Sequence, residues 1–395
     1  MVPVLNEPWG ARARETWRDV GEARRVLSCL AATAADAGGA GAPPALSVAA
    51  SDRGPLASWL LRNDLAALAF AAAWPDDADL AGLLREAAAG GAAGNLAHLA
   101  TLRCIERCFA SARLPMILLK GAAIASSGYR DPSLRPMTDL DIWIRDDDMP
   151  RAVEQLRELG FRQEAGPPHR PAALQKRSRG ELVFRHGRGE HGLVELHYGA
   201  FQGWWVRRAA APDDEALWRR AVPAGPGRHA LRLSTEDAIL QTAFHVAVNQ
   251  FGQVPLRGLM DLAVLARAHS VDWLTVAARA RDWRLATVTW LVLDTAHQLV
   301  GLPGCEAALA GLRPAPARRA ALSAFVTPRS LLAGRDLTRR LRRPAFMMSL
   351  VDRRRDGMRV IGRTLWPERW WITARYGRPV SRVRHLFGLV LRGEA

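Results

Sequence analysis

The spacing of apolar residues in this sequence changes near residue 114 and changes back near residue 225. Residues 1–113 and 226–395 place apolar side chains at helical intervals of three and four, whereas the stretch between them contains short apolar runs and strict alternation. Strands enclosed by helical flanks are typical of α+β folds. The sequence therefore predicts a helical N-terminal segment at 1–113, an α+β domain at 114–225 and a helical C-terminal domain at 226–395.

Glycine-rich runs subdivide the N-terminal segment. Residues 37–44 read AGGAGAPP and residues 87–95 read AAAGGAAGN, and both runs combine residues that favour turns or lower helix stability. The next segment, 95–113, carries an apolar stripe at helical spacing. We therefore predict helix breaks at both runs, and a helix that leads from residue 95 into the middle stretch.

The middle stretch contains the strand patterns. Residues 116–119 form an apolar run before a turn into a helix, and residues 139–144 alternate acidic with apolar side chains. Residues 182–184 and 193–198 flank the loop RHGRGEHG and predict a β-hairpin. We expect these strands to form a small mixed sheet.

Three carboxylates in these strands have the spacing of a metal site. Because side chains alternate along a strand, Asp139 and Asp141 share one face, as do Glu195 and His197 on the second strand of the hairpin. Two carboxylates at i and i+2, completed by Glu195 from a neighbouring strand, form an oxygen ligand set suited to Mg²⁺. Metals held in this way stabilise in-line displacement at phosphorus.

The positive charge is concentrated at the C-terminal end. The net charge is +16, and residues 313–395 contain 20 arginines against five acidic residues. Such a segment can bind nucleic acid, an anionic membrane surface or an acidic protein, or it can be a solvated basic face of an arginine-rich chain. Composition leaves these alternatives open.

Targeting and cysteine signals are weak. The first 30 residues have no long apolar core, and the longest apolar stretches fall short of the ~20 residues that a membrane span requires. We therefore expect a soluble, cytoplasmic protein with no membrane span. Cys104 and Cys108 stand four apart on a predicted helix, and we interpret them as packing residues without a structural zinc.

Several motifs together resemble a known enzyme superfamily. LLKGAAI, TDLDIWI and VELHY follow the order strand, glycine turn, helix, D-x-D strand and a later acidic strand of the DNA polymerase β-type nucleotidyltransferases. With LSTEDAILQTAFHVAV and LRGLMDLAVLARAH, the sequence more closely resembles an uncharacterised bacterial nucleotidyltransferase family over roughly residues 95–282. The resemblance implies transfer of a nucleoside monophosphate from an NTP, such as ATP, to an acceptor with release of pyrophosphate. It also implies Mg²⁺ or Mn²⁺, with Asp139, Asp141 and Glu195 as catalytic ligands.

Lys120 stands out because lysine is rare here. Of 55 Lys and Arg residues, only Lys120 and Lys176 are lysine. Within the resemblance, the Lys120 ammonium and the turn at Gly121 would bind triphosphate oxygens, with Arg135 as a second cation. The alternative is that Lys120 pairs with a structural carboxylate. The superfamily has Gly-Gly or Gly-Ser at this turn, whereas this chain has Gly121-Ala122 and lacks the hydroxyl.

The remaining candidates have two interpretations each. His197 either orients a ligand or acts as a base, or it is a structural histidine. His245 is interpreted mainly as a packing residue and Asp261 as an acceptor-domain residue, while Trp204-Trp205 and Trp370-Trp371 are either base-stacking or core residues.

Two other functions remain alternatives to transfer onto a small-molecule or protein acceptor. One is a catalytically silent nucleotide-binding or regulatory protein. The other is an RNA-directed enzyme or RNA-binding protein that uses the basic C-terminal segment.

Overall fold

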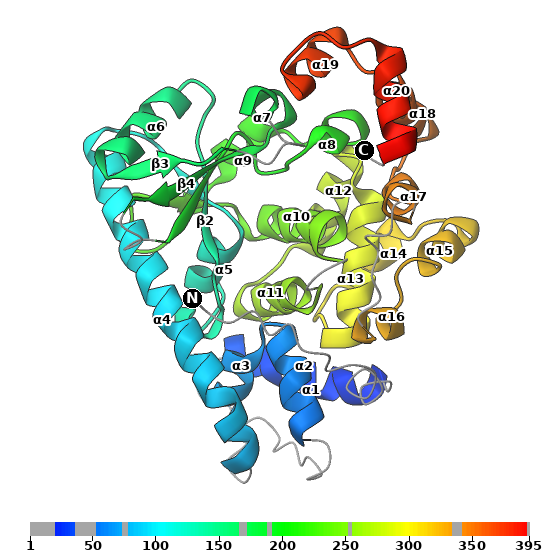
Figure 1. Ribbon diagram of the computed structural model, residues 1–395. Coiled ribbons are helices and arrows are strands. Elements are labelled where there is room, and N and C mark those ends of the chain that lie inside the picture. Colours follow the sequence, from blue (N-terminus) through cyan, green and yellow to red (C-terminus); the bar gives the residue numbers. More distant parts are fainter. Residues whose placement is uncertain are drawn as a thin grey trace.

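The sheet and the helices pack into one body in which a small sheet lies against a larger helical part (Figure 1). The computed structural model describes residues 20–35, 53–72, 78–165, 172–187, 192–251, 255–333 and 342–392. The predicted break at 37–44 and the hairpin loop at 188–191 lie outside the described residues, as does most of the stretch considered for a signal peptide. The α+β class expected from the sequence is confirmed.

Within the part of the chain that the structure describes, a mixed sheet of seven strands brings the motifs together. Its order is β3-β4-β5-β2-β1-β7-β6. The strands are β1 (Ile117–Leu118), β2 (Asp139–Trp143), β3 (Phe161–Gln163), β4 (Glu181–His186), β5 (Leu193–His197), β6 (Val222–Pro223) and β7 (Leu231–Arg232). β4 and β5 pair antiparallel, which confirms the predicted hairpin. β5 lies parallel to β2, and β2 lies antiparallel to β1. The last strand, β7, lies beyond residue 225 and pairs with β1.

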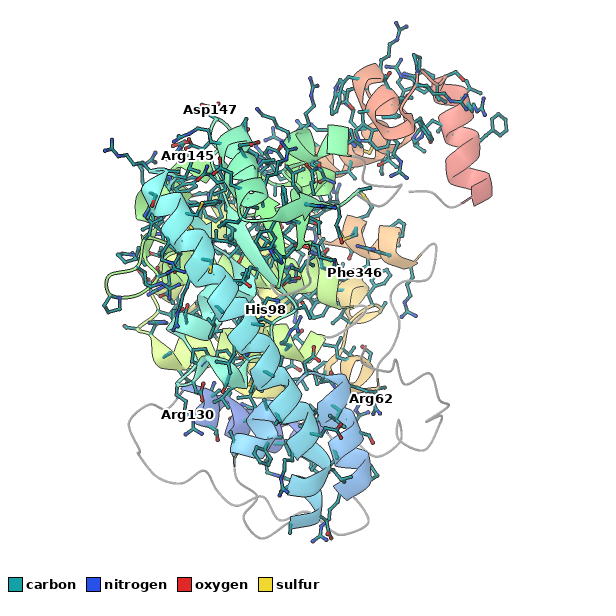
Figure 2. The ribbon with its side chains drawn as sticks, turned by 60° about the vertical axis from the view of Figure 1, so that its left-hand side comes forward. Arg62, His98, Arg130, Arg145, Asp147 and Phe346 are labelled. Carbon is teal, nitrogen blue, oxygen red and sulfur yellow. The ribbon has the colours of Figure 1, made fainter. Side chains whose placement is uncertain are left out.

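The N-terminal helices lead into this sheet through one long helix. They are α1 (Val20–Ala35), α2 (Arg53–Arg62), α3 (Ala66–Ala71) and α4 (Ala78–Ser111). α4 packs on α2 and α3 near its start and on α6 and β2 near its end, and it runs along one side of the molecule (Figure 1). Figure 2 shows α4 in front, with His98 on its sheet half and Arg62 of α2 beside its other half.

The predicted helix break at 87–95 is wrong. α4 continues through AAAGGAAGN without interruption, although each glycine costs up to ~1 kcal/mol relative to alanine in a helix. Packing at both ends of α4 stabilises the helix by more than the low helix propensity of these glycines costs. A Cβ atom added to Gly91 would lie 3.7 Å from Pro136 Cγ, so this part of the run faces the loop before β2 at ordinary van der Waals distance.

Helices that follow the first strands surround the sheet and form the centre of the molecule. They are α5 (Lys120–Ser127), α6 (Met149–Glu158), α7 (Ala172–Ser178), α8 (Trp204–Ala209), α9 (Asp214–Arg220), α10 (Thr235–His245), α11 (Pro255–Ala268), α12 (Trp273–Asp282) and α13 (Ala286–Val300). A 3₁₀ turn at Pro132–Leu134 precedes β2, and a π-helical turn at Val246–Gln250 follows α10. The Ser234 hydroxyl accepts the Asp237 N–H at the start of α10, and the Asp237 carboxylate pairs with Arg220 and Arg279.

The C-terminal helices extend away from the sheet. They are α14 (Glu306–Leu312), α15 (Pro316–Ser323), α16 (Pro328–Leu332), α17 (Arg342–Ser349), α18 (Arg354–Leu365), α19 (Arg369–Tyr376) and α20 (Arg382–Arg392). Phe346 of α17, labelled in Figure 2, is buried against Phe251 and Phe325. Within the described residues, every helix is too short or too polar to cross a lipid bilayer.

Successive side chains of β2 alternate between the hydrophobic core and the face that carries the candidate site. Leu140 and Ile142 are fully buried and pack with Phe109 of α4 in the core beneath the sheet. Asp139 and Asp141 therefore project from the opposite face, toward α5, α10 and α11.

Candidate functional site

Pairing of β2 with β5 places two of the predicted acids side by side. In this parallel register Asp141 lies opposite Glu195, and Trp143 lies opposite His197. The Nε2 atom of His197 is 2.7 Å from Asp141 Oδ1 and 3.6 Å from Glu195 Oε2. Ligand atoms of Asp141, Glu195 and His197 all lie within 4.8 Å of one another, so these three side chains can hold a metal ion. Asp139 is not among the three.

Asp139 instead faces a cavity between the sheet and the helical part. It is half-buried and lines this cavity with Asp141, Lys120 and Gly121 from the strand side. The opposite wall comes from α10 and α11 and consists of Thr242, His245, Arg257, Gly258 and Asp261. Burial raises the pKa of Asp139, and the Asp141 charge raises it further.

Lys120 contacts the acid cluster directly. Its Nζ lies 2.5 Å from Asp141 Oδ1, and this oxygen also faces His197. The backbone φ of Lys120 is 44°, in the left-handed region that costs a residue with a side chain roughly 1–2 kcal/mol. Glycine would adopt this conformation without strain. The structure thus shows Lys120 in an ion pair, as the alternative interpretation expected, and its carboxylate partner is one of the predicted metal ligands.

The ionisable groups of the cluster shift one another's pKa values. Burial lowers the pKa of Lys120, but the Asp141 and Glu195 charges outweigh burial and raise it. Burial raises the pKa of Asp141, but Lys120 and His197 outweigh burial and hold it well below its usual range. Burial and Lys120 lower the pKa of His197, but its hydrogen bonds to Asp141 and Glu195 raise it to about 9. Asp141 is thus an ionised carboxylate that is hydrogen-bonded to both Lys120 and His197.

The back of His197 is also held by side chains. Its Nδ1 is hydrogen-bonded to the Gln202 amide, which also donates to Glu181 Oε2 at 2.5 Å. The His197 side chain is fully buried. These bonds fix the ring so that Nε2 points at the two carboxylates.

Arg135 reaches the cavity as a partner of Asp261. Its Nε lies 3.1 Å from Asp261 Oδ1 and its Nη2 lies 2.9 Å from Oδ2, and both side chains are almost fully buried. Tyr129 donates a further hydrogen bond to Asp261 at 2.8 Å. A Cβ atom added to Gly121 would lie 2.5 Å from Arg135 Nη1. Gly121 therefore lets the guanidinium approach the turn at the start of α5.

Asn95 of α4 positions the loop that carries Arg135, and sequence reasoning did not identify it. Its side-chain amide donates to the carbonyls of Pro132, Ser133 and Arg135, and its Oδ1 accepts the Met137 N–H at 2.8 Å. Asn95 is fully buried. The signal in the sequence was a lone asparagine on an apolar helical stripe. Arg257 of the cavity wall was also missed, because nothing in its local pattern distinguishes it from other arginines.

Asn95→Ala should loosen this loop and destabilise the protein. Four hydrogen bonds with backbone groups would be lost, and the two buried ones, to the Arg135 carbonyl and the Met137 N–H, each leave a group whose loss of a partner costs ~1–3 kcal/mol before relaxation. We expect a free energy of unfolding at least ~2 kcal/mol lower by chemical denaturation, with faster hydrogen exchange at Met137. The exposed neighbour Leu96→Ala is the control. Equal stability of the two variants would contradict a positioning role for Asn95.

Other candidates lie outside the acid cluster. His245 lines the cavity, and its burial lowers its pKa to about 3, so it is a neutral side chain hydrogen-bonded to Asn249. Trp205 is buried beside Phe244, as expected for a core residue. Trp370 lies under the Arg177 guanidinium, and Trp371 packs edge-to-face on His385 in the C-terminal helices. Cys104 and Cys108 on α4 are free thiols that form no disulfide.

Comparison with known families identifies the family to which this chain belongs. The profile of a family described as uncharacterised nucleotidyltransferase matches residues 57–301. The chain belongs to this family. The matched region begins in α2, ends just after α13 and includes α4, the sheet and both walls of the cavity, so all the site residues above lie within it. A search of curated proteins finds no match.

Proposed function

We propose that this nucleotidyltransferase transfers a nucleoside monophosphate from an NTP to a hydroxyl, amine or phosphate of an acceptor. The observation that carries the proposal is the clustering of Asp141, Glu195 and His197 around one point, with Lys120 on the same carboxylate and Asp139 at the adjoining cavity. Acids and cations that converge beside a cavity suit a reaction that depends on positioning and charge neutralisation.

The ligand set fits a divalent cation. Asp141 and Glu195 offer carboxylate oxygens and His197 offers an imidazole nitrogen, and Asp139 adds a carboxylate on the same strand face. Oxygen ligands suit Mg²⁺, and a site that includes an imidazole also suits Mn²⁺. When bound by Asp139, Asp141 and Glu195, such a cation supplies neutralisation of phosphate charge. His197 either joins this set or orients Asp141 from behind.

The chain's own cations provide the triphosphate site. Lys120 places a compact ammonium at the cavity wall. Gly121 lies in the first turn of α5, where the backbone N–H groups favour binding of an anion. Arg135 holds its guanidinium next to Gly121, and Arg257 faces the same cavity from α11. These groups replace the hydroxyl that Gly-Ser turns provide elsewhere in the superfamily.

The proposal is tested by transfer of label. The protein is incubated with each α-³²P-labelled NTP, Mg²⁺ or Mn²⁺ and cell extract, and the labelled product is identified. Asp139→Asn is the matched inactive control, because it keeps the shape of the side chain and removes its charge. Label on an acceptor with wild-type protein but not with Asp139→Asn supports the proposal. Tight NTP binding without transfer or hydrolysis to the monophosphate would instead indicate a silent nucleotide-binding protein.

Asp261→Asn should weaken NTP binding, although Asp261 lies on the cavity wall opposite the acid cluster. The variant removes the charge that holds the Arg135 guanidinium, and the buried arginine then loses its charge-assisted partners. We expect NTP affinity to fall by about tenfold, and the free energy of unfolding to fall by ~3–5 kcal/mol, as for a broken buried ion pair. Tyr129→Phe is the control, since it removes one hydrogen bond to Asp261 and leaves the ion pair. Affinity unchanged in folded Asp261→Asn would exclude Arg135 from the binding site.

A further inference from the structure

Apolar side chains are exposed together on the basic C-terminal helices. Met358 and Phe387 have exposed fractions of 68% and 61%, and the same region exposes other large apolar residues. We call the set the C-terminal apolar patch; its members are Met358, Ile361, Leu365, Trp366, Trp370, Val383 and Phe387. Met358, Ile361 and Leu365 are spaced i, i+3 and i+7, so they form one stripe along α18.

Arginines surround this patch. Residues 353–384 contain ten arginines and two acids, and one of these acids, Asp356, is fully buried between Arg284 and Arg359. Arg355, Arg359 and Arg363 lie exposed on α18 itself. The surface therefore combines exposed apolar area with a strong positive charge, which is the pattern of helices that bind anionic lipid surfaces.

The helices that carry the patch lie at the edge of the molecule (Figure 1). α18 packs on α8 and α19 packs on α7, and Arg208 anchors the segment through an ion pair with Glu368 at 3.0 Å. α20 packs back through His385, which is hydrogen-bonded to Tyr376 and Thr364. Figures 1 and 2 both show α18, α19 and α20 at a corner of the molecule, outside the sheet and the central helices. The helices are thus held in place while their apolar stripe stays exposed.

We propose that α18–α20 bind the surface of an anionic phospholipid membrane. Methionine, isoleucine, leucine and valine gain free energy by entering the acyl boundary, tryptophan favours the headgroup level, and arginines contact lipid phosphates while their stems cover apolar surface. Nucleic acid explains the patch less well, because its bases stack on aromatic rings and gain little from exposed aliphatic chains. A second copy is disfavoured because two equally basic surfaces repel each other.

Vesicle binding by the full chain tests the proposal. The wild-type protein is sedimented with vesicles of phosphatidylcholine alone and of equal parts phosphatidylcholine and phosphatidylglycerol. We expect binding to the anionic vesicles only, weakened by salt. Ile361→Ser combined with Phe387→Ser should reduce it about tenfold or more, because apolar insertion is lost while every arginine remains. Arg354→Gln combined with Arg355→Gln, at two exposed positions of α18, should reduce it by a similar factor.

Matched variants elsewhere on the surface make the test specific. Leu96→Ser combined with Leu274→Ser changes two side chains of comparable exposure, 67% and 68%, on α4 and α12, and should bind vesicles like the wild type. Circular dichroism melts confirm that each variant is folded. Absence of vesicle binding by the wild type would overturn the proposal. Serine variants that bind like the wild type would also overturn it, and salt-sensitive binding to polyuridylate RNA in that case would identify nucleic acid as the partner.

Discussion

Asp141→Asn should reduce nucleotidyl transfer by at least about 10²–10³-fold, the range for loss of one preorganised charge-stabilising group. The same change should also destabilise the protein, because Asp141 is only 2% exposed and is the shared partner of Lys120 and His197. Removing one member of a buried ion pair costs about 3–5 kcal/mol, since the other charge stays buried without a partner. Steady-state transfer rates and chemical denaturation measure the two effects. Wild-type turnover in a folded Asp141→Asn protein would exclude Asp141 from the reaction.

Asp139→Asn is the matched variant on the same strand. Its carboxylate also faces the cavity, but it is only half-buried. We expect a comparable loss of transfer with little change in the melting temperature. Glu195→Gln should resemble Asp139→Asn in both transfer rate and melting temperature. The Glu195 side chain is also half-buried, and its Oε2 lies 3.6 Å from His197 Nε2. A stability loss in Asp139→Asn as large as in Asp141→Asn would show that both acids serve mainly as structural partners.

Lys120→Met should weaken NTP binding by ~1.5–3 kcal/mol, the value of a charge-assisted hydrogen bond to phosphate. Lys120→Arg should recover only part of this loss, because a planar guanidinium does not replace a compact ammonium. Isothermal titration with a non-hydrolysable NTP gives the affinities. The ion pair with Asp141 means that Lys120→Met also destabilises the fold, so affinity and stability must be separated.

A double-mutant cycle of Lys120→Met with Asp141→Asn separates them. If the ion pair matters only for stability, the double variant regains part of the lost free energy of unfolding, because no buried charge is left unpaired on either side. NTP affinity should stay low in every variant that lacks the ammonium. Lys120→Gly should melt above Lys120→Ala, since glycine relieves the strain of φ 44°. Unchanged NTP affinity in Lys120→Met would leave this lysine as a structural residue.

Local spacing was sufficient to predict the strands that carry the site. The alternation at Asp139–Trp143 and the two runs around 182–198 gave the D-x-D strand and the hairpin, because period-two patterns report directly which face of a strand is buried. The resemblance then indicated the family to which residues 57–301 belong. Asp141 and Glu195 were expected on neighbouring strands, and their strands are indeed paired in parallel.

Contacts across long sequence separations were not predictable in this way. Arg135 was expected as a second cation near the triphosphate, but its ion pair with Asp261 of α11 was not predicted. Likewise, the position of His197 against Asp141 depends on the register between β2 and β5, and the role of Asn95 depends on the placement of α4. The local spacing of apolar residues does not predict such pairings, since they depend on tertiary packing. The same packing let α4 continue through a glycine-rich run.

The ion pair between Arg135 and Asp261 joins the loop before β2 to a helix that follows it by more than a hundred residues. Separation of these two walls would leave two buried charges without partners, together with the Tyr129 hydroxyl. The two walls are therefore joined at one edge by a buried ion pair that is costly to break. For a ligand that binds between these walls, the Arg135 and Asp261 side chains are already ordered, which lowers the entropic cost of binding.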